Sequence, residues 1–123
     1  MKLIYIAAPF THKDHAVRQR RRAHTVSVEC ALLESGYAVI NPLRMSQDVN
    51  AGLTEAQWRR VGLAMLRRCD AMIVIALPGW SESVGLQGEI AAAEAAGISI
   101  HWIPDTYHAH KAIQLLEGES DEC

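Results

Sequence analysis

The residues most capable of chemistry lie in one short segment, LPGWSESVGLQGEIAAAEAAG, at positions 77–97. Its composition predicts a loop that leads into an alanine-rich helix beginning near Ser83 or Val84. The free backbone N–H groups and positive dipole end of that helix would favour an anion such as a phosphate, and Ser83 adds a hydroxyl donor. Gly85 and Gly88 leave room for a ligand to approach the backbone closely.

A single carboxylate, Glu89, follows one turn into this helix. It would face the same pocket if Val84, Leu86 and Ile90 take the core side. Two interpretations fit the pattern. Glu89 either favours the helix N-terminus electrostatically, a contribution under about 1 kcal/mol, or acts as a catalytic carboxylate. The spacing of the residues leaves both open.

Apolar segments alternate with helix-like segments, and this alternation predicts the elements that position the site. Strands are expected at 3–8, 37–42, 71–77 and 98–104, and helices at 14–35, 55–69, from about 84 onward and at 105–117. The most hydrophobic strand, 71–77, should be central. We therefore expect a three-layer α/β fold, flavodoxin-like or Rossmann-like, with a parallel sheet of four to five strands flanked by helices.

Several residues mark where these elements end. Gly36 is expected to stop the first helix, and Thr54 opens a capping-box pattern at the next. The polar stretch LRMSQDVNAGL at 43–53 is expected to be a loop. The chain is expected to form a single domain, residues 1–117, followed by a flexible acidic tail at 118–123.

The composition argues against several classes of function. A net charge of −2 gives no general attraction to nucleic acid or to anionic membranes, and no apolar run approaches the roughly 20 residues that span a bilayer. The apolar N-terminus is too short for a signal peptide, so a cytoplasmic protein is expected. The three cysteines and six histidines show no metal-ligand spacing. No P-loop, GxGxxG or GxSxG motif occurs, and we expect neither a metal nor an organic cofactor.

Three segments resemble the nucleoside 2-deoxyribosyltransferase-like superfamily: IYIAAPF, CDAMIVI and the 77–97 segment. The resemblance covers nearly the whole chain and keeps the order of the motifs. It extends to a small family of unknown function with an LPGW…S.G…E signature. It implies an enzyme that cleaves a glycosidic bond with Glu89 as the nucleophile that attacks the anomeric carbon of the sugar. Tyr5 would hydrogen-bond Glu89 and hold it in place.

The same resemblance implies a nucleotide as the substrate. The position six residues before the nucleophile is acidic in nucleoside-specific transferases and serine in relatives that hydrolyse nucleoside 5′-monophosphates; here it is Ser83. A hydroxyl at a helix N-terminus suits a phosphate, which a carboxylate would repel. The other expected substrate-binding residues are Gly85, Pro9, His12, Arg18 and Trp80. Relatives complete their sites with a second subunit, so a homodimer or homotetramer is expected.

One residue departs from the superfamily pattern. Active relatives carry an aspartate eight residues before the one that opens the third strand, and it handles the proton of the leaving base. Counting back from Asp70 gives Gly62. Loss of a general acid costs about 10²–10⁴-fold in rate. Asp48 and Glu55 are candidates to replace it, whereas Trp58, at helical spacing with apolar residues, is expected in the core.

The working hypothesis is an N-glycosidase or deoxyribosyltransferase-like enzyme that acts on a nucleoside 5′-monophosphate. Gly62 favours an alternative, a nucleotide-binding sensor or regulatory module that has lost catalysis. A phosphoribohydrolase acting on modified adenine nucleotides is a weaker possibility, because its usual PGGxGT motif is absent. The arginine run RQRRR at 18–22 is expected to be a solvated helix face, apart from Arg18, which is close enough to the first strand to help hold a phosphate.

Overall fold

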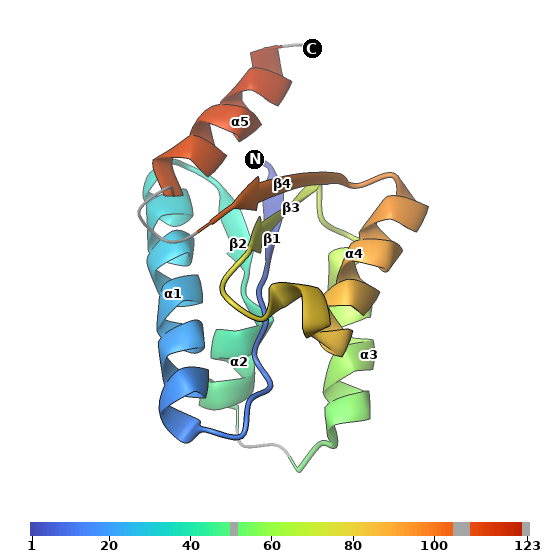
Figure 1. The fold of residues 1–123 in the computed structure, drawn as a ribbon. Coiled ribbons are helices and arrows are strands. Elements are labelled where there is room, and N and C mark those ends of the chain that lie inside the picture. Colours follow the sequence, from blue (N-terminus) through green and yellow to red (C-terminus); the bar gives the residue numbers. More distant parts are fainter. Residues whose placement is uncertain (50–51, 105–108, 122–123) are drawn as a thin grey trace.

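A computed structural model of the protein describes residues 1–49, 52–104 and 109–121. Within these residues, four parallel strands form a sheet in the order β2-β1-β3-β4 (Figure 1). The strands are β1 (Leu3–Ala7), β2 (Ala38–Ile40), β3 (Ala71–Ile75) and β4 (Ser99–Ile103). The expected fold class and flavodoxin-like strand order are confirmed. β3 lies between β1 and β4 with all five residues buried, as expected for the central strand.

Helices cover both faces of this sheet (Figure 1). They are α1 (His15–Glu34), α2 (Pro42–Asp48), α3 (Glu55–Leu66), α4 (Val84–Ala96) and α5 (Ala109–Asp121), with a short 3₁₀ helix, η1 (Trp80–Glu82), before α4. Buried side chains of α1 and α5 pack on one face of the sheet, and those of α3 and α4 pack on the other. None of the described helices is long and apolar enough to cross a membrane.

The alternation of side chains along β1 decides which residues reach each layer. Successive side chains of a strand point to opposite faces. Ile4 and Ile6 pack with the buried residues of α1, whereas Tyr5 and Ala7 pack with those of α3 and α4. Tyr5 therefore carries its hydroxyl into the layer between the sheet and the α3–α4 pair.

Capping residues set the ends of the helices as the sequence predicts. The Asp14 carboxylate accepts a hydrogen bond at the start of α1, and Gly36, with φ of 93°, follows its end. Thr54 forms the expected capping box at the start of α3. The Ser83 hydroxyl oxygen accepts a hydrogen bond from the backbone of α4 and starts that helix. The segment that carries Glu89 is therefore a capped helix, as predicted.

The polar stretch that was expected to be a loop contains helix α2. Asn41 starts this helix by accepting a hydrogen bond from the backbone N of Arg44 over 3.4 Å, and Pro42 occupies the first helical position. The buried Asn41 amide also donates to Thr25 Oγ1 over 2.9 Å and to Glu29 Oε1 over 3.1 Å. A short helix held by buried polar groups has no apolar periodicity, so the hydrophobic pattern does not predict it.

Several boundaries differ from the expected ones. β2 is shorter than predicted because Asn41 caps α2, and β3 ends at Ile75, two residues before its predicted end. The last helix begins, among the described residues, at Ala109 and ends at Asp121, so residues 118–121 of the expected tail are helical. Residues 105–108 of the predicted helix lie outside the described residues.

Candidate active site

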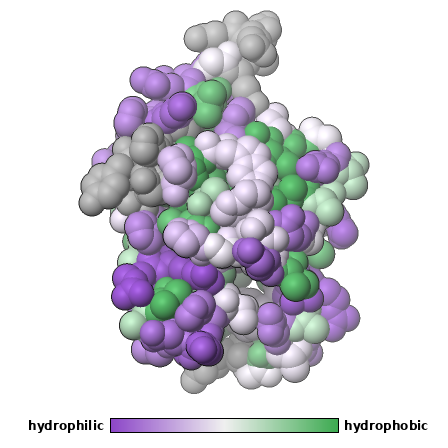
Figure 2. All heavy atoms as spheres, in the orientation of Figure 1, coloured by the Kyte–Doolittle hydropathy of each residue, from purple (hydrophilic) through white to green (hydrophobic). Residues whose placement is uncertain are grey.

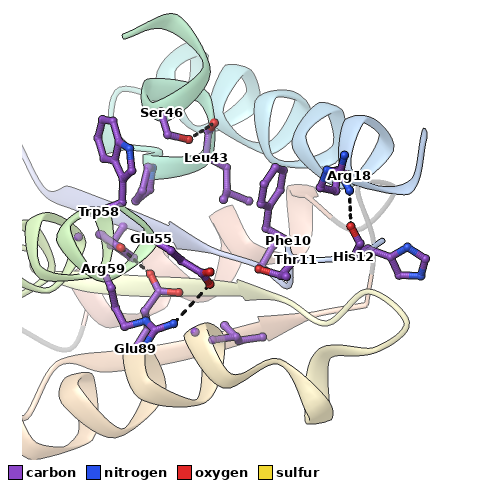
Figure 3. A pocket seen from close by; sticks show the side chains of 16 residues that line it. Phe10, Thr11, His12, Arg18, Leu43, Ser46, Glu55, Trp58, Arg59 and Glu89 are labelled. Carbon is purple, nitrogen blue, oxygen red and sulfur yellow. Dashed lines mark hydrogen bonds and ion pairs between the residues drawn. The ribbon is translucent and has the colours of Figure 1, made fainter. Parts of the chain in front are cut away.

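A cavity of about 440 Å³ lies at the carboxyl end of β1. Side chains from α1, α2, α3 and α4 and from the segment after β1 line it (Figure 3). Parallel α/β sheets bind ligands beyond the carboxyl ends of their strands, so the cavity occupies the position that the topology predicts.

Glu89 of α4 and Tyr5 of β1 meet in this cavity, although 84 residues separate them in the sequence. The Tyr5 hydroxyl donates a hydrogen bond to Glu89 Oε2 over 2.5 Å. The Tyr5 side chain is fully enclosed, with 0 % of its surface exposed, so its hydroxyl is a fixed donor. The contact holds the carboxyl group of Glu89 in one orientation at the cavity wall.

The surroundings of Glu89 shift the balance between its two protonation states. Burial raises the pKa of Glu89 to about 7, although the hydrogen bond from Tyr5 and the positive charge of Arg59 both lower it. Burial and the adjacent Glu89 charge raise the pKa of Tyr5, so this hydroxyl keeps its proton. At neutral pH Glu89 is therefore present as carboxylate and as carboxylic acid. A carboxyl group in this state, facing a cavity, is suited to nucleophilic or acid–base chemistry.

Gly62 of α3 lies directly against the Tyr5 hydroxyl. A Cβ atom at this position would lie 2.9 Å from Tyr5 Oη. Contacts this short force a shift, and the buried ring of Tyr5 has little freedom to move. An acidic side chain at residue 62 would therefore displace the hydroxyl that orients Glu89.

Helix α3 presents one face to the cavity, formed by Glu55, Trp58, Arg59 and Gly62 (Figure 3). Residues at i, i+3, i+4 and i+7 lie on the same side of a helix. Arg59 Nη2 donates to Glu55 Oε1 over 3.4 Å. The expectation that Trp58 belongs to the core is wrong. Trp58 is half-buried and lines the cavity together with Arg59.

The opposite end of the cavity is formed by the segment that follows β1 and by α1 (Figure 3). Thr11, His12 and Arg18 line it, as expected for the latter two. Arg18 donates a hydrogen bond to the main-chain carbonyl of His12. The guanidinium of Arg22 lies 4.6 Å from the ring centroid of Phe10, which also lines the cavity.

The arginine run of α1 is more than the solvated face that was expected. Arg21 donates to the carbonyl oxygens of Thr11 over 3.1 Å and Pro78 over 2.9 Å. Arg22 donates to the carbonyl of Leu43 over 2.9 Å. These arginines bind main-chain oxygens of three segments, and two of the acceptor residues, Thr11 and Leu43, line the cavity.

Tyr5, Gly85, His12, Arg18 and Glu89 line the cavity together. Three other expected site residues do not border it. The Ser83 oxygen caps α4, Pro9 is buried, and Trp80 packs edge-on against Trp102 with 5.1 Å between the ring centroids. Among the described residues, no three His, Cys, Asp or Glu side chains lie close enough to hold a metal ion.

Two expectations about the faces of α4 also need correction. Leu86 and Ile90 are buried as predicted, but Val84 is 74 % exposed, because it is the first residue of the helix and precedes the part that packs on the sheet. Gly88 is exposed and does not line the cavity, so Gly85 alone of the two glycines gives a ligand access to the backbone.

Several cavity residues were not singled out from the sequence. They are Phe10, Thr11, Leu43, Ser46 and Arg59. Phe10 and Thr11 follow the first strand, and ligands of parallel α/β sheets bind beyond the carboxyl ends of the strands, so their position in the sequence is a signal for a site. Leu43 and Ser46 belong to the unpredicted helix α2. Arg59 follows Glu55 by four residues, and this spacing predicts that the two side chains lie on the same face of the helix.

Residues 2–104 match the model of a family described as "Domain of unknown function (DUF1937)". The chain belongs to this family. Two solved structures share the fold of this DUF1937 chain. One is a 2-desoxiribosyltransferase from Leishmania mexicana, with 22 % identity, a TM-score of 0.61, and coverage of 84 % of this chain and 64 % of that one. The other is a 2-deoxyribosyltransferase from the psychrotolerant bacterium Bacillus psychrosaccharolyticus, with 20 % identity and a TM-score of 0.59. The match covers 81 % of this chain and 70 % of that one.

The likeness to these two proteins is one of fold. The DUF1937 chain spans less than two thirds of the Leishmania protein that it matches. No curated protein sequence matches the chain. The expected nucleoside deoxyribosyltransferase-like fold is nevertheless confirmed by both structures.

Proposed function

We propose that the protein cleaves the N-glycosidic bond of a nucleoside 5′-monophosphate, with Glu89 as the nucleophile. The observation that carries this proposal is the 2.5 Å hydrogen bond from Tyr5 to Glu89 inside the cavity. A carboxylate that is oriented by a fixed donor and ionises near neutral pH suits attack on an anomeric carbon. Its fold is shared with 2-deoxyribosyltransferases.

The reaction proceeds in two displacements. An oxygen of the Glu89 carboxylate attacks C1′ of the sugar, and the electron pair of the C1′–N bond leaves with the base. The product is a glycosyl ester on Glu89. Water or a second base then attacks C1′, and the ester bond breaks to restore the carboxylate. Tyr5 keeps its proton throughout and fixes the other carboxylate oxygen.

The two ends of the cavity fit the two ends of a nucleotide. Arg18 and His12 stand at one end and the α3 residues at the other (Figure 3). The phosphate lies near Arg18 and the N-terminal end of α4, where Gly85 gives access to backbone N–H groups and Ser83 stands beside them. The sugar then lies over Glu89, and the base points toward Trp58. This reaction requires neither a metal nor an organic cofactor.

We further propose that the protein forms a homodimer or homotetramer. Apolar side chains gather on the surface over α4 and β4, whereas hydrophilic ones cover the N-terminal half of α1 (Figure 2). Val84 is 74 % exposed, and Trp102, on the edge strand β4, is 42 % exposed. A second copy would cover this surface. Sedimentation of the protein as a monomer at micromolar concentration would contradict the assembly.

Incubation with ribo- and deoxyribonucleosides and their 5′-monophosphates tests the glycosidase directly. Free base is followed by chromatography for the wild type, for Glu89→Ala and for the control Glu94→Ala, an exposed carboxylate on the same helix. We expect base release by the wild type and the control alone, and faster release from the monophosphates. Base release by Glu89→Ala at the wild-type rate would contradict the role of Glu89.

A nucleotide-binding module without catalysis is the second candidate. Gly62 favours it, because the position where active relatives carry an acid holds no side chain and has no room for one. Such a module would raise its melting temperature in the presence of a nucleotide and would release no base from any member of the panel. Glu89→Ala would then bind the nucleotide as well as the wild type does.

A further inference from the structure

We propose that Arg59 stabilises the departing base by donating hydrogen bonds to it, in place of the proton that an acid would supply. Glu55 is the positioning residue that holds the Arg59 guanidinium, and Trp58 contacts the face of the base. This proposal rests on the glycosidic cleavage proposed above. In this proposal, one face of α3 assists the leaving base, a step for which Gly62 has no side chain.

Among the described residues that line the cavity, no acid is free to serve the leaving base. Gly62 has no side chain, and a Cβ there would lie 2.9 Å from Tyr5 Oη. Among the described lining residues the carboxylates are Glu55 and Glu89. Glu89 is assigned to the sugar, and Glu55 Oε1 is engaged by Arg59 Nη2 over 3.4 Å. Asp48, the other candidate from the sequence, binds Arg44 over 3.2 Å and does not line the cavity.

Arg59 has the position and the chemistry that this step needs. It lines the end of the cavity opposite Arg18 and shares a helix face with Trp58 (Figure 3). Arg59 and Glu89 line the same cavity, and the positive charge of Arg59 lowers the pKa of the Glu89 carboxyl group. Its side chain is 42 % exposed, so donors not used by Glu55 are open to a ligand.

An arginine can assist the departure without giving up a proton. When the C1′–N bond breaks, its electron pair moves onto the base, and negative charge develops on the ring nitrogens and carbonyl oxygens. The guanidinium remains protonated in proteins and donates up to five hydrogen bonds to such acceptors. Donors aimed at developing charge stabilise the transition state. The base leaves as a hydrogen-bonded anion and takes its proton from water after release.

The test compares two leaving groups in the full-length protein. One substrate is the nucleoside 5′-monophosphate that the panel shows to be cleaved fastest. The other is 4-nitrophenyl β-D-ribofuranoside 5′-phosphate, whose nitrophenolate departs without assistance. Arg59→Gln is compared with the control Arg60→Gln, a neighbouring exposed arginine of α3 that does not line the cavity.

We expect Arg59→Gln to lower kcat/KM for the nucleotide about 100-fold, which is the effect of losing one transition-state donor. The kcat/KM for the nitrophenyl substrate should stay nearly unchanged. Arg60→Gln should change neither. Glu55→Gln provides a second variant, because it frees the guanidinium and should cause a smaller loss, again confined to the nucleotide. Thermal melting of each variant checks that it is folded.

An equal loss on both substrates would overturn the proposal, because Arg59 would then act only through the charge state of Glu89. Undiminished cleavage of both substrates by Arg59→Gln would overturn it as well. Failure of the proposed function itself has a different signature: the wild type would release base from no member of the panel and would not cleave the nitrophenyl substrate. Glu89→Ala should cleave neither, which separates the nucleophile from the group that assists the base.

Discussion

Glu89 lies in surroundings that favour its protonated form, and this makes its charge costly to the fold. Burial raises its pKa in the folded state to about 7, above the ordinary value of 4.5. The folded state therefore binds the proton more tightly than the unfolded chain does between these values. Stability from this group is fully present below about pH 4.5 and is lost as the pH rises through 7.

Replacement of Glu89 by glutamine should therefore stabilise the protein at high pH while it abolishes catalysis. The glutamine carbonyl can still accept the hydrogen bond from Tyr5. In urea denaturation at pH 8.5 we expect the free energy of unfolding of Glu89→Gln to exceed that of the wild type by up to about 3 kcal/mol. At pH 4.5 the two free energies should be nearly equal. The exposed Glu94→Gln should show no such pH-dependent difference. A wild type as stable as Glu89→Gln at pH 8.5 would contradict the burial of a charge at this position.

The Tyr5 hydroxyl should set the pH at which the protein becomes active. Its hydrogen bond lowers the pKa of Glu89, so Tyr5→Phe should raise that pKa. The acidic limb of the pH profile of kcat/KM would then move to higher pH, with about a tenfold loss at acidic pH for each unit of the shift. Kinetics from pH 5 to 9 measure this limb. An unmoved limb would show that Tyr5 does not act on the ionisation of Glu89.

Helix α3 owes the shape of its cavity face to Gly62. A glycine inside a helix costs about 1 kcal/mol of stability relative to alanine, so Gly62 lowers the intrinsic stability of α3. Gly88 occupies a comparable interior position in α4, where an added Cβ would meet no atom within 4 Å. The two positions form a matched pair for testing the contact with Tyr5.

We expect Gly88→Ala to raise the free energy of unfolding by about 0.5–1 kcal/mol, the full gain in helix propensity. Gly62→Ala should gain nothing or be destabilised by about 1–2 kcal/mol, because overpacking against Tyr5 opposes that gain. It should also lower activity by displacing the hydroxyl that orients Glu89. Chemical denaturation of both variants measures the difference. Equal stabilisation by the two substitutions would contradict a tight contact between Gly62 and Tyr5.

Helix α2 is held to α1 by an ion pair between Arg44, whose side chain is 40 % exposed, and the buried Glu29. Arg44 Nε and Nη2 donate to Glu29 over 2.7 and 2.8 Å, and Glu29 is buried. Arg44→Met leaves that carboxylate without its cation and should cost about 1–3 kcal/mol, because Arg44 is partly exposed and Asn41 still donates a hydrogen bond to Glu29. Asp48→Asn, which breaks only the exposed pair with Arg44, should cost under about 1 kcal/mol. Thermal denaturation of both variants compares them, and similar losses would show that burial does not strengthen the Glu29 pair.

The elements themselves were largely predictable, and the exceptions have physical causes. Apolar runs and caps such as Ser83 predicted β1, β3 and α4, because these signals are local. α2 was missed because buried polar contacts to Glu29, rather than an apolar face, hold it. Trp58 has the spacing of a core residue but lines the cavity, because helical spacing alone does not distinguish a face that packs in the core from one that lines a cavity.

For the molecule as a whole, the order of the strands sets the place of the site. Parallel α/β sheets bind ligands beyond the carboxyl ends of their strands, and the cavity lies at the carboxyl end of β1. The pairing of Tyr5 with Glu89 was expected from resemblance to a superfamily, since no local signal joins residues 84 positions apart. The position of Arg59 in the cavity depends on how α3 packs against α4, and no local pattern in the sequence predicts this packing.

The most direct test of Glu89 as a nucleophile is intact-mass and peptide mass spectrometry after incubation with 2′-deoxy-2′-fluoro nucleoside 5′-monophosphates. Fluorine at C2′ slows hydrolysis of the glycosyl ester, so the covalent intermediate should accumulate. We expect the wild type to gain the mass of one fluorinated sugar phosphate on the peptide that contains Glu89, and Glu89→Ala to gain none. An adduct on a different residue, or steady base release from these analogues without any adduct, would contradict the proposed mechanism.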